Sequence, residues 1–411
     1  MYRGFVRPQD DRAGSRREPG SMSNSLRAPE DTAAPGARAT ARLPLLDVLR
    51  GAAILGTLMT NVWIFAAPGS EWAFLQGAPM ADPFTEPAEA VFRFLADGKF
   101  LAMLTVLFGV GLAIQYDSAA RRGTPWPRGY RPRALFLLAE GTLHFVLVFG
   151  FDVLMGYAVT ALLVARLLVR SERVRRAVMW TSAGLHVALM SLITLSLLAD
   201  PAAGGRVSAG AVDLYAHGSW LDQIAFRLEN AVVLRLEPVL SFGLLVFLFL
   251  LGVRLHRAGA FTPTGHGRRL RARMAGWGLG LGIPCNAALT LGGQDFFFLG
   301  RYVAAPVVAV GYLGLIGVLL DRGWLPAPVS RGLTAVGRTA LSCYVAQNLL
   351  CMLACYGLGL GLAERLADGG PWWVMGLWAA VSATLVTAAT LWLRRFPNGP
   401  LESVQRRALR R

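Results

Sequence analysis

The chain has 411 residues, of which 54% are hydrophobic and only 16% charged, and its mean hydropathy is +0.46. This composition excludes a string of ordinary soluble domains, although the length alone would accommodate two or three. The formal net charge of +16 does not indicate a nucleic-acid-binding protein, because no soluble domain is present to carry a basic face.

The N-terminal segment, residues 1–42, is rich in Arg, Pro, Gly, Ala and Ser and almost devoid of large apolar side chains. Such a segment cannot bury enough surface to offset its ordering entropy, so we predict a disordered tail. Translation could begin at Met1 or at Met22. The first apolar run is too long for the core of a signal peptide, so we expect a retained helix.

Apolar runs of 17 or more residues follow one another along the rest of the chain, each long enough to cross about 30 Å of hydrocarbon as a helix. The ten runs are 43–67, 93–116, 133–150, 152–170, 176–199, 234–256, 272–293, 300–321, 333–360 and 372–394. We therefore predict an all-α, polytopic membrane protein. Its transmembrane bundle spans residues 43–394, and a basic cytoplasmic stub spans residues 395–411.

The basic residues are distributed unevenly between the two predicted sides of the membrane. Both tails, with Arg394 counted in the C-terminal one, and every second loop hold 33 of the 41 Lys and Arg residues, whereas the opposite loops are mainly acidic. The basic loops are 117–133, 166–176, 254–273 and 322–338. Because cytoplasmic loops carry an excess of Lys and Arg, this pattern predicts that both termini lie in the cytoplasm.

The first predicted helix carries polar side chains on one face. At about 100° per residue, Asp47, Arg50, Thr57 and Asn61 fall on one narrow stripe. One interpretation is that Asp47 caps the helix and Arg50 reaches back to the cytoplasmic surface. The other is that the stripe lines an internal site, since ionisable residues at membrane depth normally face a protein interior. Only the second interpretation explains the deeper Thr57 and Asn61.

The third and fourth predicted helices are joined by a short turn and should form a hairpin at the outer surface. His144 lies six residues before Gly150 of the turn, Glu140 lies one helical turn further in, and Asp152 begins the next helix. A neutral imidazole beside a carboxylate is suited to accept a proton from a hydroxyl or an amine. The alternative is a histidine bonded to a neighbouring helix, with Asp152 only capping its own helix.

The ninth predicted helix presents two polar faces, with Tyr344 and Asn348 on one and Arg338 and Ser342 on the other. Burial by neighbours on both sides and close packing of small residues both fit this pattern. In the C-terminal stub, Glu402 and Arg406 are spaced for an i, i+4 ion pair.

The four cysteines all fall inside predicted membrane helices, and no CxxC motif occurs. The sequence therefore predicts neither a zinc site nor a disulfide framework, and no other metal site is expected.

The opening block, "RLPLLDVLRGAAILGTLMTNV", resembles the start of the YeiB-like bacterial membrane proteins, whose C-terminal half is described as domain of unknown function 418. The blocks "LFGVGLAIQ", "GTLHFVLVFGFDVLMGYA", "VGRTALSCYVAQN" and "GPLESVQR" resemble further blocks of the family in the same order. The resemblance covers about residues 42–409 and places the domain of unknown function at about 234–409. Glu140 departs from the family pattern, in which that position is usually apolar.

The same LDxxRG opening is similar to that of membrane acyltransferases, including relatives of heparan-α-glucosaminide N-acetyltransferase. This similarity implies transfer of an acyl group from a cytoplasmic acyl-CoA to a hydroxyl or amine acceptor, such as a small molecule or a glycan. His144 would then be the general base, with Asp152 and Glu140 orienting or polarising it. The substrate-binding residues would be Asp47, Arg50, Asn61, Arg338, Tyr344 and Gln347. Acyl-CoA would be a co-substrate, and no permanently bound cofactor is implied.

Two other functions stay open at this point. A transporter or channel would use the same intramembrane charges as a path for its substrate, and Pro284 could open a broken helix near the midplane. A non-catalytic membrane assembly protein would need neither activity. In every case we expect a multi-pass protein of the cell membrane with lipid as its solvent and no nucleic-acid partner. The oligomeric state is not readable from the sequence.

Overall fold

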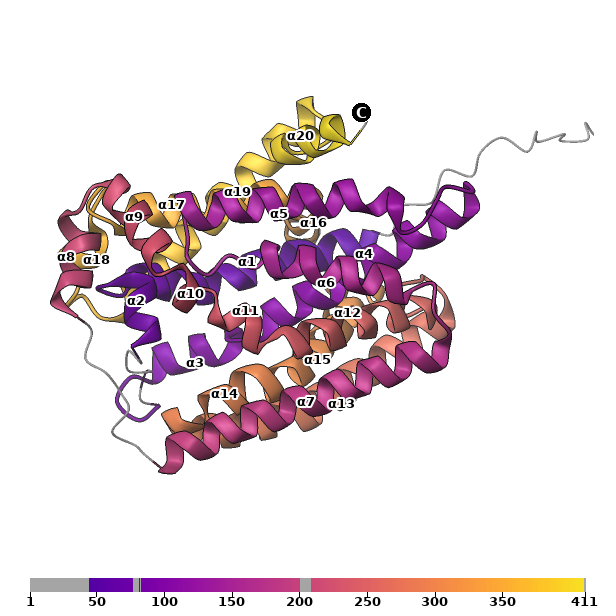
Figure 1. The fold of residues 1–411 in the computed structure, drawn as a ribbon, viewed down its shortest axis with the longest axis horizontal. Coiled ribbons are helices and arrows are strands. Elements are labelled where there is room, and N and C mark those ends of the chain that lie inside the picture. Colours follow the sequence, from indigo (N-terminus) through magenta and orange to yellow (C-terminus); the bar gives the residue numbers. More distant parts are fainter. Residues whose placement is uncertain (1–43, 77–80, 82, 200–207, 410–411) are drawn as a thin grey trace, which may run out of the picture. The chain divides into compact units, whose positions relative to one another are not determined.

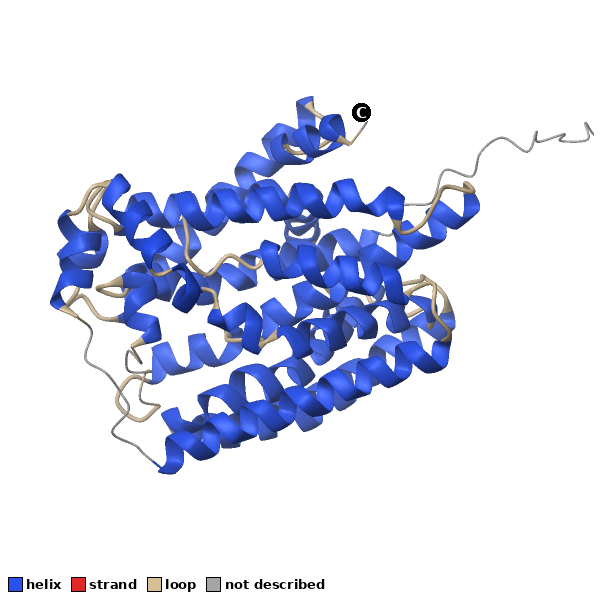
Figure 2. Cartoon of the chain, in the orientation of Figure 1, coloured by secondary structure: helices blue, strands red, loops and turns tan. Residues whose placement is uncertain are grey.

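The computed structural model describes residues 44–76, 81, 83–199 and 208–409. Every regular element in these segments is a helix, as predicted, and Figure 2 shows only helices joined by loops. The tail predicted to be disordered, residues 1–42, lies outside the described residues.

The longer helices account for most of the described chain (Figure 1). They are α1 (Pro44–Ala66), α3 (Pro87–Ala96), α4 (Lys99–Arg121), α5 (Arg131–Leu147), α6 (Leu154–Leu167), α7 (Glu172–Ala199), α12 (Phe242–Arg257), α13 (Gly265–Leu291), α15 (Ala305–Asp321), α16 (Ala327–Arg338), α17 (Ala340–Cys355) and α19 (Pro371–Arg395). The shorter helices are α2 (Ser70–Leu75), α8 (Ala209–His217), α9 (Trp220–Glu229), α10 (Ala231–Leu234), α11 (Leu236–Leu240), α14 (Phe297–Leu299), α18 (Leu362–Arg365) and α20 (Pro400–Ala408).

All ten predicted apolar runs contain helix, but they are not ten uninterrupted rods. Five helical stretches of the described chain have both the length and the hydropathy of a membrane span. They are Pro44–Ala66, Pro87–Arg121, Glu172–Ala199, Gln294–Asp321 and Pro371–Arg395. These five have the properties of membrane helices, whereas the total of ten spans stays a prediction.

Local backbone features divide two of the predicted helices. The second breaks between α3 and α4 at Gly98, whose φ of 74° is readily adopted only by glycine. A Cβ there would also lie 2.4 Å from the Arg301 carbonyl oxygen. The ninth divides into α16 and α17 at Thr339. In contrast, α13 continues through Pro284, so the break that the sequence suggested there does not form.

Close helix packing depends on glycine at several crossings. At the crossing of α1 and α16, a Cβ on Gly337 would lie 1.8 Å from the Asp47 carbonyl oxygen, and one on Gly51 would lie 2.0 Å from that of Leu333. At the crossing of α13 and α15, a Cβ on Gly278 would lie 2.3 Å from the backbone nitrogen of Gly311. Small residues let helix backbones approach in lipid, where no hydrophobic effect drives helices together.

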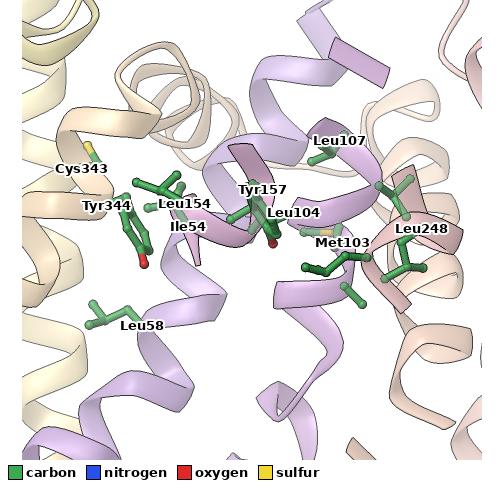
Figure 3. Close-up of a cluster of buried hydrophobic side chains, with 14 of the residues drawn as sticks. Ile54, Leu58, Met103, Leu104, Leu107, Leu154, Tyr157, Leu248, Cys343 and Tyr344 are labelled. Carbon is green, nitrogen blue, oxygen red and sulfur yellow. The ribbon is translucent and has the colours of Figure 1, made fainter. Parts of the chain in front are cut away.

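The helices α1, α4, α6, α12 and α17 enclose the core around the candidate site. Figure 3 shows the ring of Tyr344 near Ile54, Leu58 and Leu154, with Tyr157 further along the same apolar cluster. All five side chains are at most 3% exposed. The polar groups described below are therefore embedded in a packed interior.

The hairpin of α5 and α6 forms, as predicted, but its turn is buried beneath other residues of the chain. Phe149 is 1% and Asp152 0% exposed. The described part of the segment between the fifth and sixth predicted spans folds into α8 to α10, and side chains of α9 cover the turn. Trp220 donates to the Leu147 carbonyl (2.8 Å) and Arg227 to the Val148 carbonyl (3.2 Å). These donors satisfy carbonyls that the end of α5 would otherwise leave unpaired.

Candidate functional site

The centre of the candidate site is a buried histidine–aspartate pair. His144 Nδ1 lies 2.9 Å from Asp152 Oδ2, and their side chains are 1% and 0% exposed. An acceptor-only carboxylate at Nδ1 requires that this nitrogen carry the proton, which leaves the lone pair on Nε2. The arrangement is that of a histidine base held in one tautomer by a carboxylate.

The first turn of α6 fixes the position of the Asp152 carboxylate. Its Oδ1 accepts hydrogen bonds from the backbone N–H groups of Leu154 (2.9 Å) and Met155 (3.2 Å). This is the capping role that the sequence allowed, and it coexists with the contact to His144. The Tyr344 hydroxyl donates to Asp152 Oδ2 over 3.3 Å, and a Cβ on Gly141 would lie 2.6 Å from Oδ1. The carboxylate therefore has little freedom to move.

A pair of asparagines connects the second nitrogen of His144 to α1. Asn348 Nδ2 lies 3.2 Å from His144 Nε2, and Asn61 Nδ2 donates to Asn348 Oδ1 over 3.1 Å. The direction of these bonds agrees with an unprotonated Nε2. The Asn348 amide therefore occupies the position at which a substrate donor would meet the base.

A fully buried ion pair lies beside the α5–α6 turn. Glu71 Oε1 lies 3.4 Å from Arg227 Nε and accepts from the Gly150 N–H over 2.9 Å. The Tyr356 hydroxyl donates to Glu71 Oε2 over 3.3 Å. Burial raises the pKa of Glu71, but the charge of Arg227 and the Gly150 hydrogen bond more than offset this effect, so that the pKa lies below its usual value. The pair links α2 and α9 to the turn that carries Asp152.

A small cavity lies next to the pair of His144 and Asp152. Its lining includes Asn61 and Tyr344 of this network, together with Glu237 and Arg301. Its volume of about 30 Å³ is enough for one or two water molecules. A second cavity of about 50 Å³ also contacts Arg301 and is lined by Lys99, among others. Arg301 thus contacts both cavities.

The guanidinium of Arg301 is buried, and its Nε has no hydrogen-bond partner among the residues that the structure describes. Its nearest carboxylate oxygens belong to Glu237 (3.7 Å) and Asp97 (3.8 Å). Glu237 instead accepts a short hydrogen bond from the Tyr302 hydroxyl, at 2.6 Å. Lys99, 2% exposed, donates to the Asp97 carbonyl over 3.3 Å. The site therefore has one buried guanidinium N–H, at Arg301 Nε, that lacks a partner among the described residues.

Four of the nine predicted site residues come together, because His144, Asp152, Asn61 and Tyr344 all belong to the network described above. Glu140 does not join them: its carboxylate oxygens are buried but have no hydrogen-bond partner among the described residues. The same holds for the side-chain amide of Gln347, which is 0% exposed.

The predicted basic residues lie outside this network. Arg50 pairs with Asp47 over 3.4 Å near the start of α1. Eleven residues separate Arg50 from Asn61, which corresponds to about 16 Å along a helix. Arg338 donates to the Pro397 carbonyl over 3.1 Å, at the end of α16. Neither guanidinium forms a hydrogen bond or ion pair with His144. The polar stripe on α1 therefore has an ion pair at one end and the amide of Asn61 at the other.

The C-terminal block has a different role from the predicted i, i+4 pair with Arg406. Glu402 Oε1 accepts from the backbone N–H groups of Leu341 (2.8 Å) and Ser342 (3.3 Å), and the Ser342 hydroxyl donates to Oε2 over 2.6 Å. These N–H groups belong to the first turn of α17, which would otherwise lack acceptors. Glu402 therefore caps the helix that carries Tyr344 and Asn348.

Sequence reasoning missed several polar residues of the site. Asn348 had a visible signal, because it lies one helical turn after Tyr344 on the same face. Arg301 also had one, as a lone arginine at the start of an apolar run. Arg227 and Glu237 had none, since their local sequence does not show which side chains they meet. In the described part of the chain, no group of three or more His, Cys, Asp or Glu side chains could hold a metal ion.

Comparison with known proteins agrees with the order of the sequence blocks. The family "Protein of unknown function (DUF418)" matches residues 255–411. Uncharacterized protein YxaH of Bacillus subtilis is 26% identical over 397 residues, which cover 89% of this chain and 94% of that protein. Uncharacterized protein YeiB of Escherichia coli is 27% identical over 385 residues, covering 87% and 93%. The similarity to these relatives extends over both halves of the chain, so the chain is similar over most of its length to the YeiB-like DUF418 proteins.

Proposed function

We propose that the protein is an integral-membrane acyltransferase of the cell membrane, which moves an acyl group from a cytoplasmic acyl-CoA to a hydroxyl or amine acceptor. The observation that carries the proposal is the buried pair of His144 and Asp152, with Nδ1 of the histidine held by the carboxylate at 2.9 Å. The resemblance of the opening block to membrane acyltransferases supports the same reaction class, as an analogy between families.

In the proposed reaction, the acceptor O–H or N–H replaces the Asn348 amide at His144 Nε2 and gives its proton to the imidazole. The acceptor atom forms a bond to the thioester carbonyl carbon, whose oxygen becomes an oxyanion. When the tetrahedral intermediate collapses, the C–S bond breaks and the CoA thiolate takes the proton from the imidazolium. Asp152 stabilises the imidazolium throughout and keeps it oriented.

The other polar groups are proposed to bind the substrates. Asn61 and Tyr344 line the cavity beside His144, where the acceptor would lie. Arg301 lines the same cavity and would stabilise a developing negative charge, since its Nε has no hydrogen-bond partner among the described residues. Arg50, near the opposite end of α1, would bind an anionic part of the acyl donor. A cavity of about 30 Å³ is too small for these substrates, so helices must separate during turnover.

The test is acyl transfer by the purified full chain in proteoliposomes, supplied with radiolabelled acetyl-CoA and a bacterial metabolite extract, with acylated products identified by mass spectrometry. We expect His144→Ala to slow transfer at least ~100-fold. His186→Ala is the matched control, because His186 is equally buried (3% exposed) and its Nε2 lies 3.2 Å from the Tyr302 backbone carbonyl oxygen. A folded His144→Ala protein with the wild-type rate would refute the assignment.

The proposed topology has ten spans with both termini in the cytoplasm, and the charge distribution supports it. Cysteine labelling from each side of intact membranes tests it, with Cys285→Ser as the background because Cys285 is the exposed one of the four cysteines. Glu86→Cys should react only from outside and Arg269→Cys only from the cytoplasm. Labelling of both positions from the same side would contradict the topology.

Transport is the second candidate, and the two small cavities that both contact Arg301 favour it. Such cavities, together with buried ionisable groups, are typical of permeation paths through membrane proteins. Accumulation of a substrate inside proteoliposomes without any acyl donor would support transport, whereas covalent modification of a substrate would support the enzyme. A purified, folded protein that does neither would indicate an assembly role.

A further inference from the structure

A pocket remote from His144 lies between the start of α7 and the end of α12. Its volume is about 290 Å³, close to the lower end of the ~300–1,000 Å³ that is usual for small-molecule sites. Met179, Leu250 and Val253 form its apolar part. Its charged residues are Glu172, Arg175, Arg176, Arg254 and Arg257. The lining of this one pocket thus contains four guanidinium groups and one carboxylate.

The charges in this pocket are not balanced. Glu172 is 2.6 Å from Arg175 and 3.9 Å from Arg257, so the one acidic side chain is shared between two arginines. The guanidinium groups of Arg176 and Arg254 make no ion pair or hydrogen bond with any residue that the structure describes. The pocket therefore has an excess of positive charge and unused N–H donors, which are the groups that recognise a phosphate.

Nearby groups do not cancel this excess. Asp117 lies 3.4 Å from His256 and is used in that contact. The remaining donors of Arg175 go to the carbonyls of Leu168 (3.2 Å) and Arg170, which fixes this guanidinium at the end of α6. Arg175 is thus a structural part of the pocket, whereas Arg176 and Arg254 are free to contact a ligand.

The surface beside the pocket is strongly apolar. Within α7, only 17% of an apolar stretch of 18 residues is buried inside the protein. Trp180 lies one turn beyond Arg176 and is 59% exposed, and Leu185, Leu192 and Leu195 further along α7 are each more than 60% exposed. Trp is enriched where a membrane helix meets the headgroup layer. A cationic pocket thus adjoins a face suited to hydrocarbon chains.

We propose that this pocket binds the phosphate-containing headgroup of an anionic glycerophospholipid, with its acyl chains lying along the exposed face of α7. A lipid headgroup and a soluble phosphate compound would both present a phosphate to Arg176 and Arg254. The adjoining apolar face favours the lipid over the soluble compound. Basic pockets between transmembrane helices bind anionic headgroups in this way. The proposal does not depend on the acyltransferase activity.

Native mass spectrometry of the full chain, released from nanodiscs of either phosphatidylglycerol or phosphatidylcholine, tests the proposal. We expect retained phosphatidylglycerol but little phosphatidylcholine. The double variant Arg176→Gln, Arg254→Gln should bind phosphatidylglycerol at least ~10-fold more weakly. The matched control is Arg268→Gln, Arg269→Gln, which removes the same charge from exposed positions at the start of α13 that do not line the pocket. Thermal unfolding checks that both variants fold.

The proposal is overturned if the two double variants lose lipid equally, because binding would then follow net charge, or if the pocket variant keeps wild-type affinity. Two soluble competitors, inorganic pyrophosphate and CoA, identify the source of the phosphate. If phosphatidylglycerol stays bound at millimolar concentrations of both competitors, the result supports a lipid as the ligand of the pocket. Displacement of the lipid by either competitor, abolished in the pocket variant, would show instead that the pocket is a site for a soluble phosphate compound.

Discussion

Replacing Glu71 with glutamine should destabilise the protein far more than its place in a predicted loop suggests. The substitution keeps the shape of the side chain and an acceptor for the Gly150 N–H. It removes the only carboxylate within 4.0 Å of the Arg227 guanidinium in the described chain, while Arg227 stays completely buried. The variant therefore isolates the loss of the charge.

The magnitude follows from the geometry. Two unit charges 3.4 Å apart attract by about 5 kcal/mol at an effective dielectric constant of ~20. Removal of one partner from a buried pair typically costs ~3–5 kcal/mol, because the other charge is left uncompensated. We expect a loss of this size in the free energy of unfolding. The α5–α6 turn should loosen first, since Arg227 also bonds the carbonyls of Val146 and Val148.

The measurement is equilibrium unfolding of the purified protein in mixed detergent micelles, with helical circular dichroism as the readout. Glu172→Gln serves as the control, because Glu172 contacts Arg175 at 2.6 Å but its side chain is 53% exposed. An exposed pair of this kind contributes about 0–1 kcal/mol. If the two variants lose the same stability, the buried pair does not hold the turn and the reasoning fails.

Three further predictions concern the same unfolding measurement. Gly337→Ala should lower the free energy of unfolding by about 1–3 kcal/mol, because the new Cβ would lie 1.8 Å from the Asp47 carbonyl oxygen. Gly276→Ala is the control, and it should be neutral or stabilising because the space around Gly276 is open. Equal effects of the two substitutions would contradict the close packing. Glu402→Ala should cost about 1–2 kcal/mol by uncapping α17, and a cost near zero would show that water replaces the cap. Because folding lowers the pKa of Glu71, its contribution to the free energy of unfolding should be complete above the usual carboxylate pKa of 4.5 and lost as the pH falls below that value. Glu71→Gln should therefore reduce the loss of stability at acidic pH. An unchanged loss of stability at acidic pH would argue against the lowered pKa.

Local sequence was sufficient for the helices and for part of the site. The length and hydropathy of the apolar runs predicted all-helical structure, because backbone groups in lipid must be satisfied within each segment. The pair of His144 and Asp152 could also be predicted from local sequence. Both residues flank one short turn, so their proximity depends only on the formation of a hairpin. Tyr344 and Asn61 could be selected because each lies on a polar stripe of its helix.

Contacts between segments that are distant in the chain could not be predicted from local sequence. The burial of the α5–α6 turn depends on Arg227, which lies in a stretch that reads as an outer loop. Arg301 meets Glu237 across 64 positions of the chain, and neither hydropathy nor helical periodicity encodes such a pairing. Pro284 was misread for a related reason: a proline disrupts one turn, but neighbouring helices can hold the surrounding backbone in place.

The two asparagines behind His144 have a consequence for the movement of protons. A carboxamide neither gains nor loses a proton near neutral pH, so the sequence of contacts from His144 through Asn348 to Asn61 is an insulator for protons. A proton taken up by Nε2 cannot leave towards α1 along this route. In the proposed reaction the proton leaves to the CoA thiolate after the acceptor has displaced the Asn348 amide, which ties the charge state of the histidine to occupancy of the site.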